Sequence, residues 1–183
     1  YQLKDTALGH GTGILSLLAQ KSEIESSQNY SLNKIKFLSC NGLESGRYDY
    51  LNILECFDWI FIQPNVDVLV NAWLVNQPGC QYEWLHPLKM LWAANTIPVF
   101  SVGNYGETQS MDYSPANLSP FKDVPLITVG ALAKDQQKLA SSSFGVSQCD
   151  SNRILPSLMA PGEDLHVAVP FTPTSYQKID GTS

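Results

Sequence analysis

The chain has 183 residues, of which 44% are hydrophobic and 15% charged, a composition typical of a folded domain and not of a disordered chain. Its formal net charge of −6 argues against a nucleic-acid partner, because phosphate binding needs a clustered basic surface. The 11 Lys and Arg residues are scattered and no apolar run approaches the ~18 residues of a membrane-spanning helix, so no membrane span is expected either.

The apolar residues predict helices and strands in alternation. In chain order these are a helix at 12–21, a strand at 35–40, a helix at 47–63, a strand at 67–73, a helix at 82–95, and strands at 97–102 and 125–131. The third element carries a stripe at helical spacing that should pack on a sheet, formed by Tyr50, Leu54, Phe57 and Phe61. Apolar strands separated by helices indicate parallel βαβ units. The predicted fold class is therefore α/β, with three α/β/α layers around a mostly parallel central sheet.

Three short motifs place reactive side chains at turns between these elements. His10 lies in Gly9-His10-Gly11-Thr12 before the first helix, Asn104 follows the 97–102 strand, and Ser183 ends Gly181-Thr182-Ser183. A base, an amide donor and a hydroxyl nucleophile are the groups that acyl transfer through a tetrahedral oxyanion requires. Each motif alone also fits an ordinary turn, because Gly and Asn tolerate positive φ. Their combination, at the edge of an α/β sheet where ligands bind, indicates a shared catalytic site.

The remaining histidines and the cysteines are interpreted as structural. His86 lies within a predicted helix and His166 within an apolar strand. The four cysteines are too far apart for a zinc knuckle or a CxxC redox pair. Cys40 falls in an apolar run and is expected to be a small core residue. Cys80 and Cys149 lie in polar, loop-like surroundings and are candidates for a disulfide in an oxidising compartment.

A series of motifs, in order along nearly the whole chain, resembles the catalytic domain of subtilisin-like serine peptidases (subtilases). The histidine motif is the first and the serine motif the last. Between them come Asp67 to Leu74, Ile97-Pro98-Val99 with Gly103-Asn104-Tyr105-Gly106, Ser114-Pro115-Ala116, Leu126 to Ala131, Leu139 to Gly145, and Met159-Ala160-Pro161-Gly162.

This resemblance implies a serine endopeptidase that works through a Ser-His-Asp triad and an acyl-enzyme. Ser183 is expected to be the nucleophile, His10 the general base, and Asn104 the oxyanion donor, together with the N–H of Ser183. The expected substrate is an extended polypeptide, bound as an added strand between Ala72-Trp73-Leu74 and Ser101-Val102-Gly103. No cofactor and no metal are expected. The likeness also implies a secreted or extracytoplasmic protein and is compatible with a propeptide in the full-length chain.

The sequence departs from the family pattern at the triad aspartate, which in subtilases ends a strand well upstream of the histidine. Asp5 is too close to His10 for the intervening residues to form that strand and its return, so it is interpreted as a solvated loop acid. Residues 1–183 are interpreted as one partial domain, without the first strand that carries the aspartate and without the helix after the serine. On this interpretation the parent protein is a peptidase and the 183 residues alone are inactive.

Smaller departures concern specificity. Ala72 and Leu74 stand where serine and glycine are usual, so Leu74 is expected to narrow the S1 pocket, which receives the residue before the scissile bond. Gly13 stands where many relatives carry a second histidine that is not part of the triad. Residues 23–33 do not match the calcium loop of the best-known relatives, so no calcium is expected there.

Two alternatives stay open. A catalytically dead subtilase-like module for binding or scaffolding is supported by Leu74 and by the missing aspartate. The residue at the triad position of the full-length chain distinguishes this inactive module from the enzyme.

An esterase of the α/β-hydrolase type needs GxSxG after a strand and a late histidine, and the sequence has neither.

Overall fold

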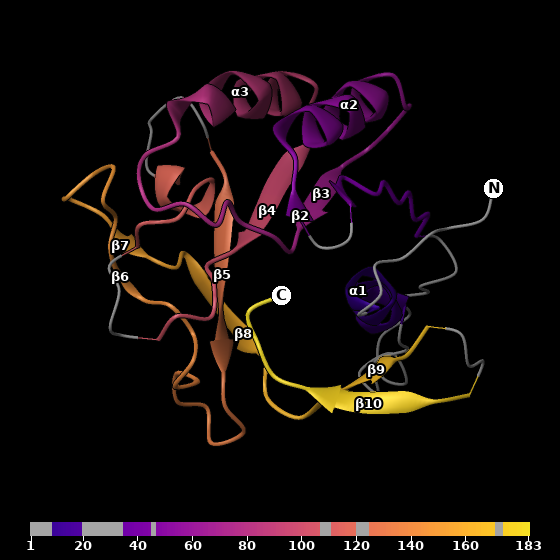
Figure 1. Cartoon of the computed structure of the whole chain (residues 1–183), viewed down its shortest axis with the longest axis vertical. Helices are drawn as coiled ribbons and strands as arrows, with labels where there is room; N and C mark the ends of the chain where they lie inside the picture. Colours follow the sequence, from indigo (N-terminus) through magenta and orange to yellow (C-terminus); the bar gives the residue numbers. More distant parts are fainter. Residues whose placement is uncertain (1–8, 20–34, 45–46, 107–110, 120–124, 171–173) are drawn as a thin grey trace.

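A parallel sheet forms the centre of the fold. A computed structural model of the chain describes residues 9–19, 35–44, 47–106, 111–119, 125–170 and 174–183 (Figure 1). The sheet has the strand order β3-β4-β5-β8, and each neighbouring pair is parallel. Its strands are β3 (Val68–Asn71), β4 (Ile97–Ser101), β5 (Ile127–Leu132) and β8 (Leu158–Pro161). The predicted α/β fold class with a mostly parallel sheet is confirmed.

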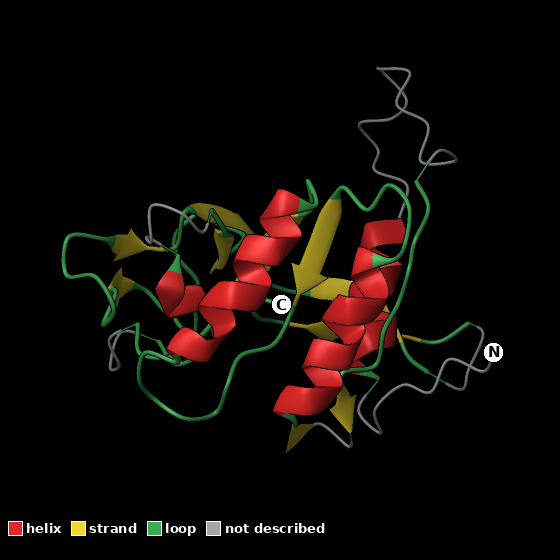
Figure 2. Ribbon diagram, turned by 90° about the horizontal axis from the view of Figure 1, so that it is seen from above, coloured by secondary structure: helices red, strands yellow, loops and turns green. Residues whose placement is uncertain are grey.

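Two helices lie side by side over this sheet, as Figures 1 and 2 show. They are α2 (Tyr50–Phe61) and α3 (Leu85–Ala93), the latter entered from a 3-10 turn, η3 (Tyr82–Trp84). Trp84 is fully buried, and its ring meets Tyr50 at 4.8 Å, Trp73 at 5.3 Å and Phe57 at 6.1 Å between centroids. Contacts between large aromatic rings of this kind dominate core energetics, so this cluster fixes both helices on the sheet.

Helix α2 begins at Tyr50 and not at residue 47 as predicted. The Asp49 side chain accepts hydrogen bonds from the backbone N–H groups of Leu51 and Asn52 at 2.9 and 3.3 Å, which makes Asp49 the N-cap. The residues before it form β2 (Arg47–Tyr48), which pairs antiparallel with β1 (Leu43–Glu44). The predicted stripe is buried at Phe57, and its other members pack at the edge of the core.

The predicted strand at residues 35–40 is not formed. These residues have no regular secondary structure and are all exposed, and no described strand pairs with them. Cys40 is therefore not a core residue. It forms a disulfide with Cys56 of α2, with 5.8 Å between their Cα atoms. An apolar run becomes a buried strand only where a partner lies beside it, and a short run does not reveal its partner.

The strand predicted at 67–73 is shorter than expected and only partly buried. Val68 and Val70 of β3 are 51% and 41% exposed, whereas Asn71 is buried. The reason is its place at the edge of the described sheet, with β4 on one side only.

The N-terminal helix is held by a hairpin from the other end of the chain. Helix α1 (His10–Ala19) packs on β9 (Leu165–Ala168), which pairs antiparallel with β10 (Tyr176–Ile179). The Oγ of Ser16 accepts a hydrogen bond from the N–H of Ala168 at 3.0 Å. A Cβ at Gly13 would lie 3.4 Å from Val167, so a small residue there lets the helix approach the strand closely. The hairpin thus connects the start of α1 to the segment that ends at Ser183.

The second disulfide joins Cys80 to Cys149, the pair suggested by the sequence, across 69 positions of the chain. It lies among short elements outside the sheet: η4 (Ala116–Leu118), β6 (Gly145–Val146) and β7 (Ile154–Leu155). Of the helices in the described part of the chain, none has the length and apolar character needed to cross a membrane.

Candidate active site

The site is built at the carboxyl end of β4. The strand leads into Gly103 and the exposed Asn104. Gly103 has φ +97°, and a Cβ on it would lie 2.8 Å from Leu74 Cδ2 and 3.2 Å from Tyr105 Cδ2. Both the backbone conformation and the lack of space therefore require glycine at position 103.

The serine motif docks on this turn. The backbone N–H of Thr182 donates to Asn104 Oδ1 at 2.9 Å, and the N–H of Gly103 donates to Thr182 Oγ1 at 3.2 Å. The N–H of Gly181 donates to the carbonyl of Gly162 at 2.8 Å. These bonds bring together residues 78 and 79 positions apart and place Ser183 directly beyond the residue that holds Asn104.

The same contact orients the Asn104 amide. A backbone N–H can only donate, so the atom that faces Thr182 must be the amide oxygen, Oδ1. The Nδ2 group, which carries the two N–H donors, is therefore on the other side of the amide. Oriented in this way, Asn104 can donate to an oxyanion without giving up its bond to the serine motif.

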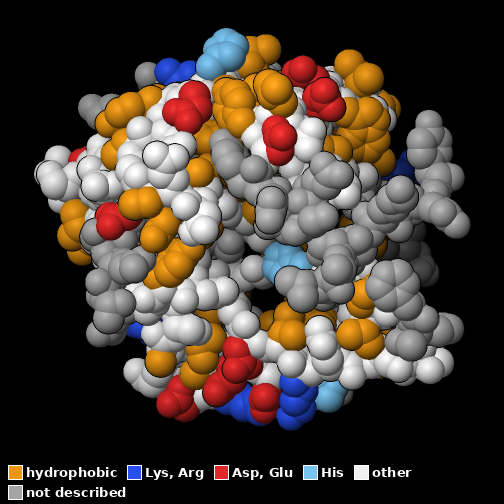
Figure 3. Space-filling model, viewed as in Figure 1, with side chains coloured by type: hydrophobic (Ala, Val, Ile, Leu, Met, Phe, Trp, Pro, Cys, Tyr) orange, Lys and Arg blue, Asp and Glu red, His pale blue; other side chains and the backbone are white. Residues whose placement is uncertain are grey.

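His10 is the first residue of α1, which begins two residues before the predicted Thr12, and its side chain is exposed. The turn before it is made by Gly9, which has φ +66°. Figure 1 shows the C-terminus between the central sheet and α1, and Figure 3 shows a hollow on this face of the molecule with a histidine side chain beside it. Asp5 and residues 23–33 lie outside the described residues, so the predictions on them stay predictions.

The two predicted substrate-binding segments are neighbours, because β3 and β4 pair directly before them. Their side chains differ in direction. Trp73 packs edge-to-face on Phe100 and at a tilt on Trp84, and Val102 is buried. The core therefore takes up Trp73 and Val102, whereas Leu74 lies against Gly103.

A run of serines behind the turn was not predicted to have a role. The N–H of Ser143 donates to the carbonyl of Gly103 at 2.9 Å, and Ser143 Oγ accepts from the N–H of Tyr105 at 3.1 Å. The N–H of Gly106 donates to the carbonyl of Ser141 at 2.8 Å. Together with Thr182, these groups fix the backbone on both sides of Asn104.

Two tyrosines stack beside the asparagine. The ring centroids of Tyr105 and Tyr113 lie 4.4 Å apart, with an angle of 20° between the ring planes. Burial, and secondarily the charge of Tyr113, raise the pKa of Tyr105, so its phenol stays neutral at physiological pH. The stack adds an uncharged aromatic surface next to Leu74 and Gly103.

Charged groups gather away from this turn, at the lower edge of the molecule in Figure 3. Asp164 pairs with Lys134 and Lys178, and hydrogen bonds from the two ammonium groups lower the pKa of its carboxyl. The N–H of Asp164 donates to Oδ1 of Asp180, the residue directly before the serine motif, at 2.7 Å.

Within the described residues, no group of three His, Cys, Asp or Glu side chains is arranged to hold a metal ion.

The Thr182 hydroxyl gives a direct test of this docking. The Thr182→Val variant is expected to lose about 1–3 kcal/mol of unfolding free energy, because the buried N–H of Gly103 loses its acceptor. Thr182→Ser keeps the hydroxyl and is the matched control, expected to stay close to wild type. Urea denaturation measures both. Equal stability of the Val and Ser variants would show that the bond contributes nothing.

Fold and site together define an α/β protein that carries a polar site at the carboxyl edge of a parallel sheet. A sequence profile of the subtilase family matches residues 1–183, and the chain belongs to this family, as the motifs predicted. Among solved structures the chain is similar to that of the prenylagaramide maturation protease PagA, with a TM-score of 0.58 and 18% identity. The match covers 76% of this chain and 46% of that one, so this chain spans about half of its length, and at this identity the likeness concerns the fold. No curated protein sequence matches the chain.

Proposed function

We propose that the protein carrying this chain is a serine endopeptidase, with Ser183 as nucleophile, His10 as general base and Asn104 as oxyanion donor. The docking of Gly181-Thr182 on Asn104 supports the proposal most, because it sets a nucleophile motif beside an oriented amide donor. Family membership supports the same reaction type. The third triad member, an aspartate by family resemblance, is assigned to none of the described residues.

In this mechanism the Ser183 hydroxyl attacks the carbonyl carbon of the scissile peptide bond while His10 takes its proton. The carbonyl oxygen becomes an oxyanion that accepts hydrogen bonds from the Nδ2 amide of Asn104 and from the backbone N–H of Ser183. When the C–N bond breaks, His10 gives its proton to the leaving amine and the acyl group stays on Ser183. Water then attacks this ester, again with His10 as base, and releases the carboxylic acid.

The proposed substrate is an extended polypeptide that lies between the segments after β3 and β4. The solved structure similar to this chain is that of a maturation protease, which is compatible with a polypeptide substrate. We also propose a secreted or extracytoplasmic location. The two disulfides are compatible with an oxidising environment.

A fluorophosphonate probe tests the proposed function, because it reacts with an activated serine. The full-length protein is expected to be labelled, with the label on Ser183 by peptide mass spectrometry, and to cleave a denatured protein substrate. Absence of both label and cleavage would contradict the enzyme and favour the inactive binding module.

Replacing Leu74 tests the shape of the proposed peptide site. Its side chain lies against Gly103 and is expected to limit the S1 pocket to small residues. Leu74→Ala should raise kcat/KM for substrates with Phe or Leu before the scissile bond about tenfold relative to substrates with Ala, the effect of a few methylene groups in an apolar pocket. A peptide library measures the ratio. Easy acceptance of Phe, Tyr or Leu by the wild type would contradict the narrowed pocket.

A further inference from the structure

The segment that follows Leu74 is held by hydrogen bonds from a distant loop. Residues 74–81 form no helix or extended strand. The N–H of Val75 donates to the carbonyl of Ser114 at 2.9 Å, and the N–H of Gly79 donates to the carbonyl of Asp112 at 2.7 Å. The position of Leu74 against Gly103 thus depends on the loop that contains Ser114.

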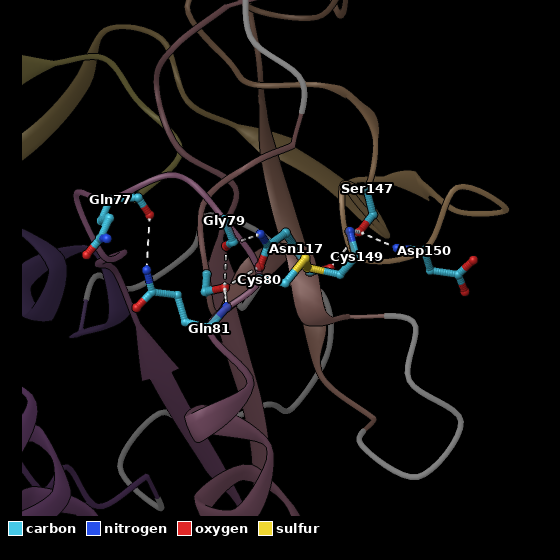
Figure 4. Close-up of a disulfide and its surroundings, with 9 residues drawn as sticks. Gln77, Gly79, Cys80, Gln81, Asn117, Ser147, Cys149 and Asp150 are labelled. Carbon is cyan, nitrogen blue, oxygen red and sulfur yellow. Dashed lines mark hydrogen bonds between the residues drawn. A yellow bond between two sulfur atoms is a disulfide. The ribbon is translucent and has the colours of Figure 1, made fainter.

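Two fully buried side chains complete this attachment. Ser114 Oγ lies 2.6 Å from Asn117 Oδ1 and 3.1 Å from the carbonyl of Gly79, and it accepts from the N–H of Gln81 at 3.0 Å. Asn117 Nδ2 donates to the same Gly79 carbonyl at 3.0 Å. Figure 4 shows the Asn117 side chain turned toward Gly79. We name Ser114 and Asn117 the polar clamp.

A third buried hydroxyl faces away from residues 74–81. Ser147 Oγ donates to the backbone carbonyl of Asn117 at 2.6 Å and accepts from the N–H groups of Cys149 and Asp150 at 3.0 and 3.3 Å. It thus joins the backbone of the clamp residue Asn117 to the loop that carries Cys149, the disulfide partner of Cys80. Ser147 is a comparison for the clamp with similar burial, because its hydroxyl bonds Asn117, Cys149 and Asp150 whereas the clamp side chains bond Gly79 and Gln81.

We propose that the polar clamp is a positioning device for substrate binding: Ser114 and Asn117 hold residues 74–81 so that Leu74 and its backbone form one wall of the peptide site. The clamp touches neither the serine motif nor Asn104 in its hydrogen bonds. It acts on peptide binding through the wall and has no part in bond making. This proposal rests on the proposed peptidase function.

The clamp is suited to this task because its groups are buried. When a partner is removed, a buried donor or acceptor remains unsatisfied, and the segment moves to find water or another partner. In Asn117→Ala the carbonyl of Gly79 loses one donor and Ser114 loses its closest partner. The disulfide at Cys80 still anchors the segment to the fold, so the expected result is displacement of the wall and not unfolding.

The test compares Asn117→Ala with Ser147→Ala in the full-length protein. Asn117→Ala is expected to raise KM for a peptide substrate about tenfold, with kcat within about threefold of wild type. This pattern is expected when a variant loses binding energy that the substrate and the transition state share equally. Ser147→Ala is expected to leave KM unchanged. In Asn117→Ala, hydrogen exchange should accelerate at the amides of Val75, Gly79 and Gln81, and in Ser147→Ala at those of Cys149 and Asp150.

The outcomes separate the clamp from the proposed function. Equal KM values in the two variants, or a fall in kcat with KM unchanged, would overturn the clamp. If no form of the protein cleaves peptides, the proposed function fails, while hydrogen exchange still decides whether the clamp holds residues 74–81. Should Asn117→Ala not fold, Ser114→Ala makes the same test with the loss of a single hydroxyl, and exchange unchanged at Gln81 in that variant would count against the clamp.

Discussion

Replacing Ser183 by alanine is expected to lower turnover on a peptide substrate about 10⁶-fold, the loss seen when subtilisin, a member of this family, loses its nucleophile. The variant has no hydroxyl to attack the carbonyl, so no acyl-enzyme forms. The Ser183 side chain is exposed, and its loss should leave the unfolding transition unchanged. Turnover and thermal unfolding, measured on the same preparation, separate a lost nucleophile from a damaged fold.

The matched control for this variant is Ser175→Ala. Ser175 is also exposed and lies beside β10, away from the docked motif. It is expected to keep full activity and full fluorophosphonate labelling. The assignment of Ser183 fails if its alanine variant still cleaves peptide at more than about a thousandth of the wild-type rate, because loss of a triad nucleophile costs far more.

Replacing Asn104 by aspartate is expected to lower kcat by at least about 10²–10³, the range found for loss of the corresponding donor in subtilisin itself. A carboxylate keeps the acceptor for the N–H of Thr182 but has no N–H to give, and it places negative charge where the oxyanion forms. The docking of the serine motif should survive in this variant. KM should change little, because the donor acts in the transition state.

Asn104→Ala completes this comparison. It removes the oxyanion donor and the acceptor for Thr182 together, so it should lose turnover and also about 1 kcal/mol of unfolding free energy. Urea denaturation and steady-state kinetics measure the two effects separately. Turnover retained in Asn104→Asp would refute the role of the amide as donor, whatever the stability of the alanine variant.

Much of the sheet could be predicted from apolar runs, because β4 and β5 are inner strands whose residues are all buried or partly buried. Residues 35–40 have an apolar run similar to those of β4 and β5, but they are exposed. A strand is buried only when another strand or helix packs beside it, and the run itself does not specify that partner. The start of α2 has a local sequence signal, the N-cap residue Asp49, which the apolar periodicity does not reveal. Asp49 is a good N-cap residue, and its side chain ends the non-helical segment.

The candidate site was predicted from its reactive residues and not from the residues that position them. Thr182 and Ser143 lie within matched motifs, but their positioning roles arise from contacts across 79 and 38 positions. Ser114 belonged to a recognised motif, but its bond to Gln81 spans 33 positions and left no periodic pattern. Side chains that support a site are visible only once the chain has folded.

The Cys80–Cys149 bridge has a consequence for proteolysis of this chain by any peptidase. The bridge encloses the stretch that contains Asn104, so a single nick anywhere inside it leaves two pieces still covalently joined. Protein nicked between Cys80 and Cys149 would then run as one band on a non-reducing gel and separate into fragments only after a thiol is added. Such damage would cut the backbone without releasing either half of the molecule.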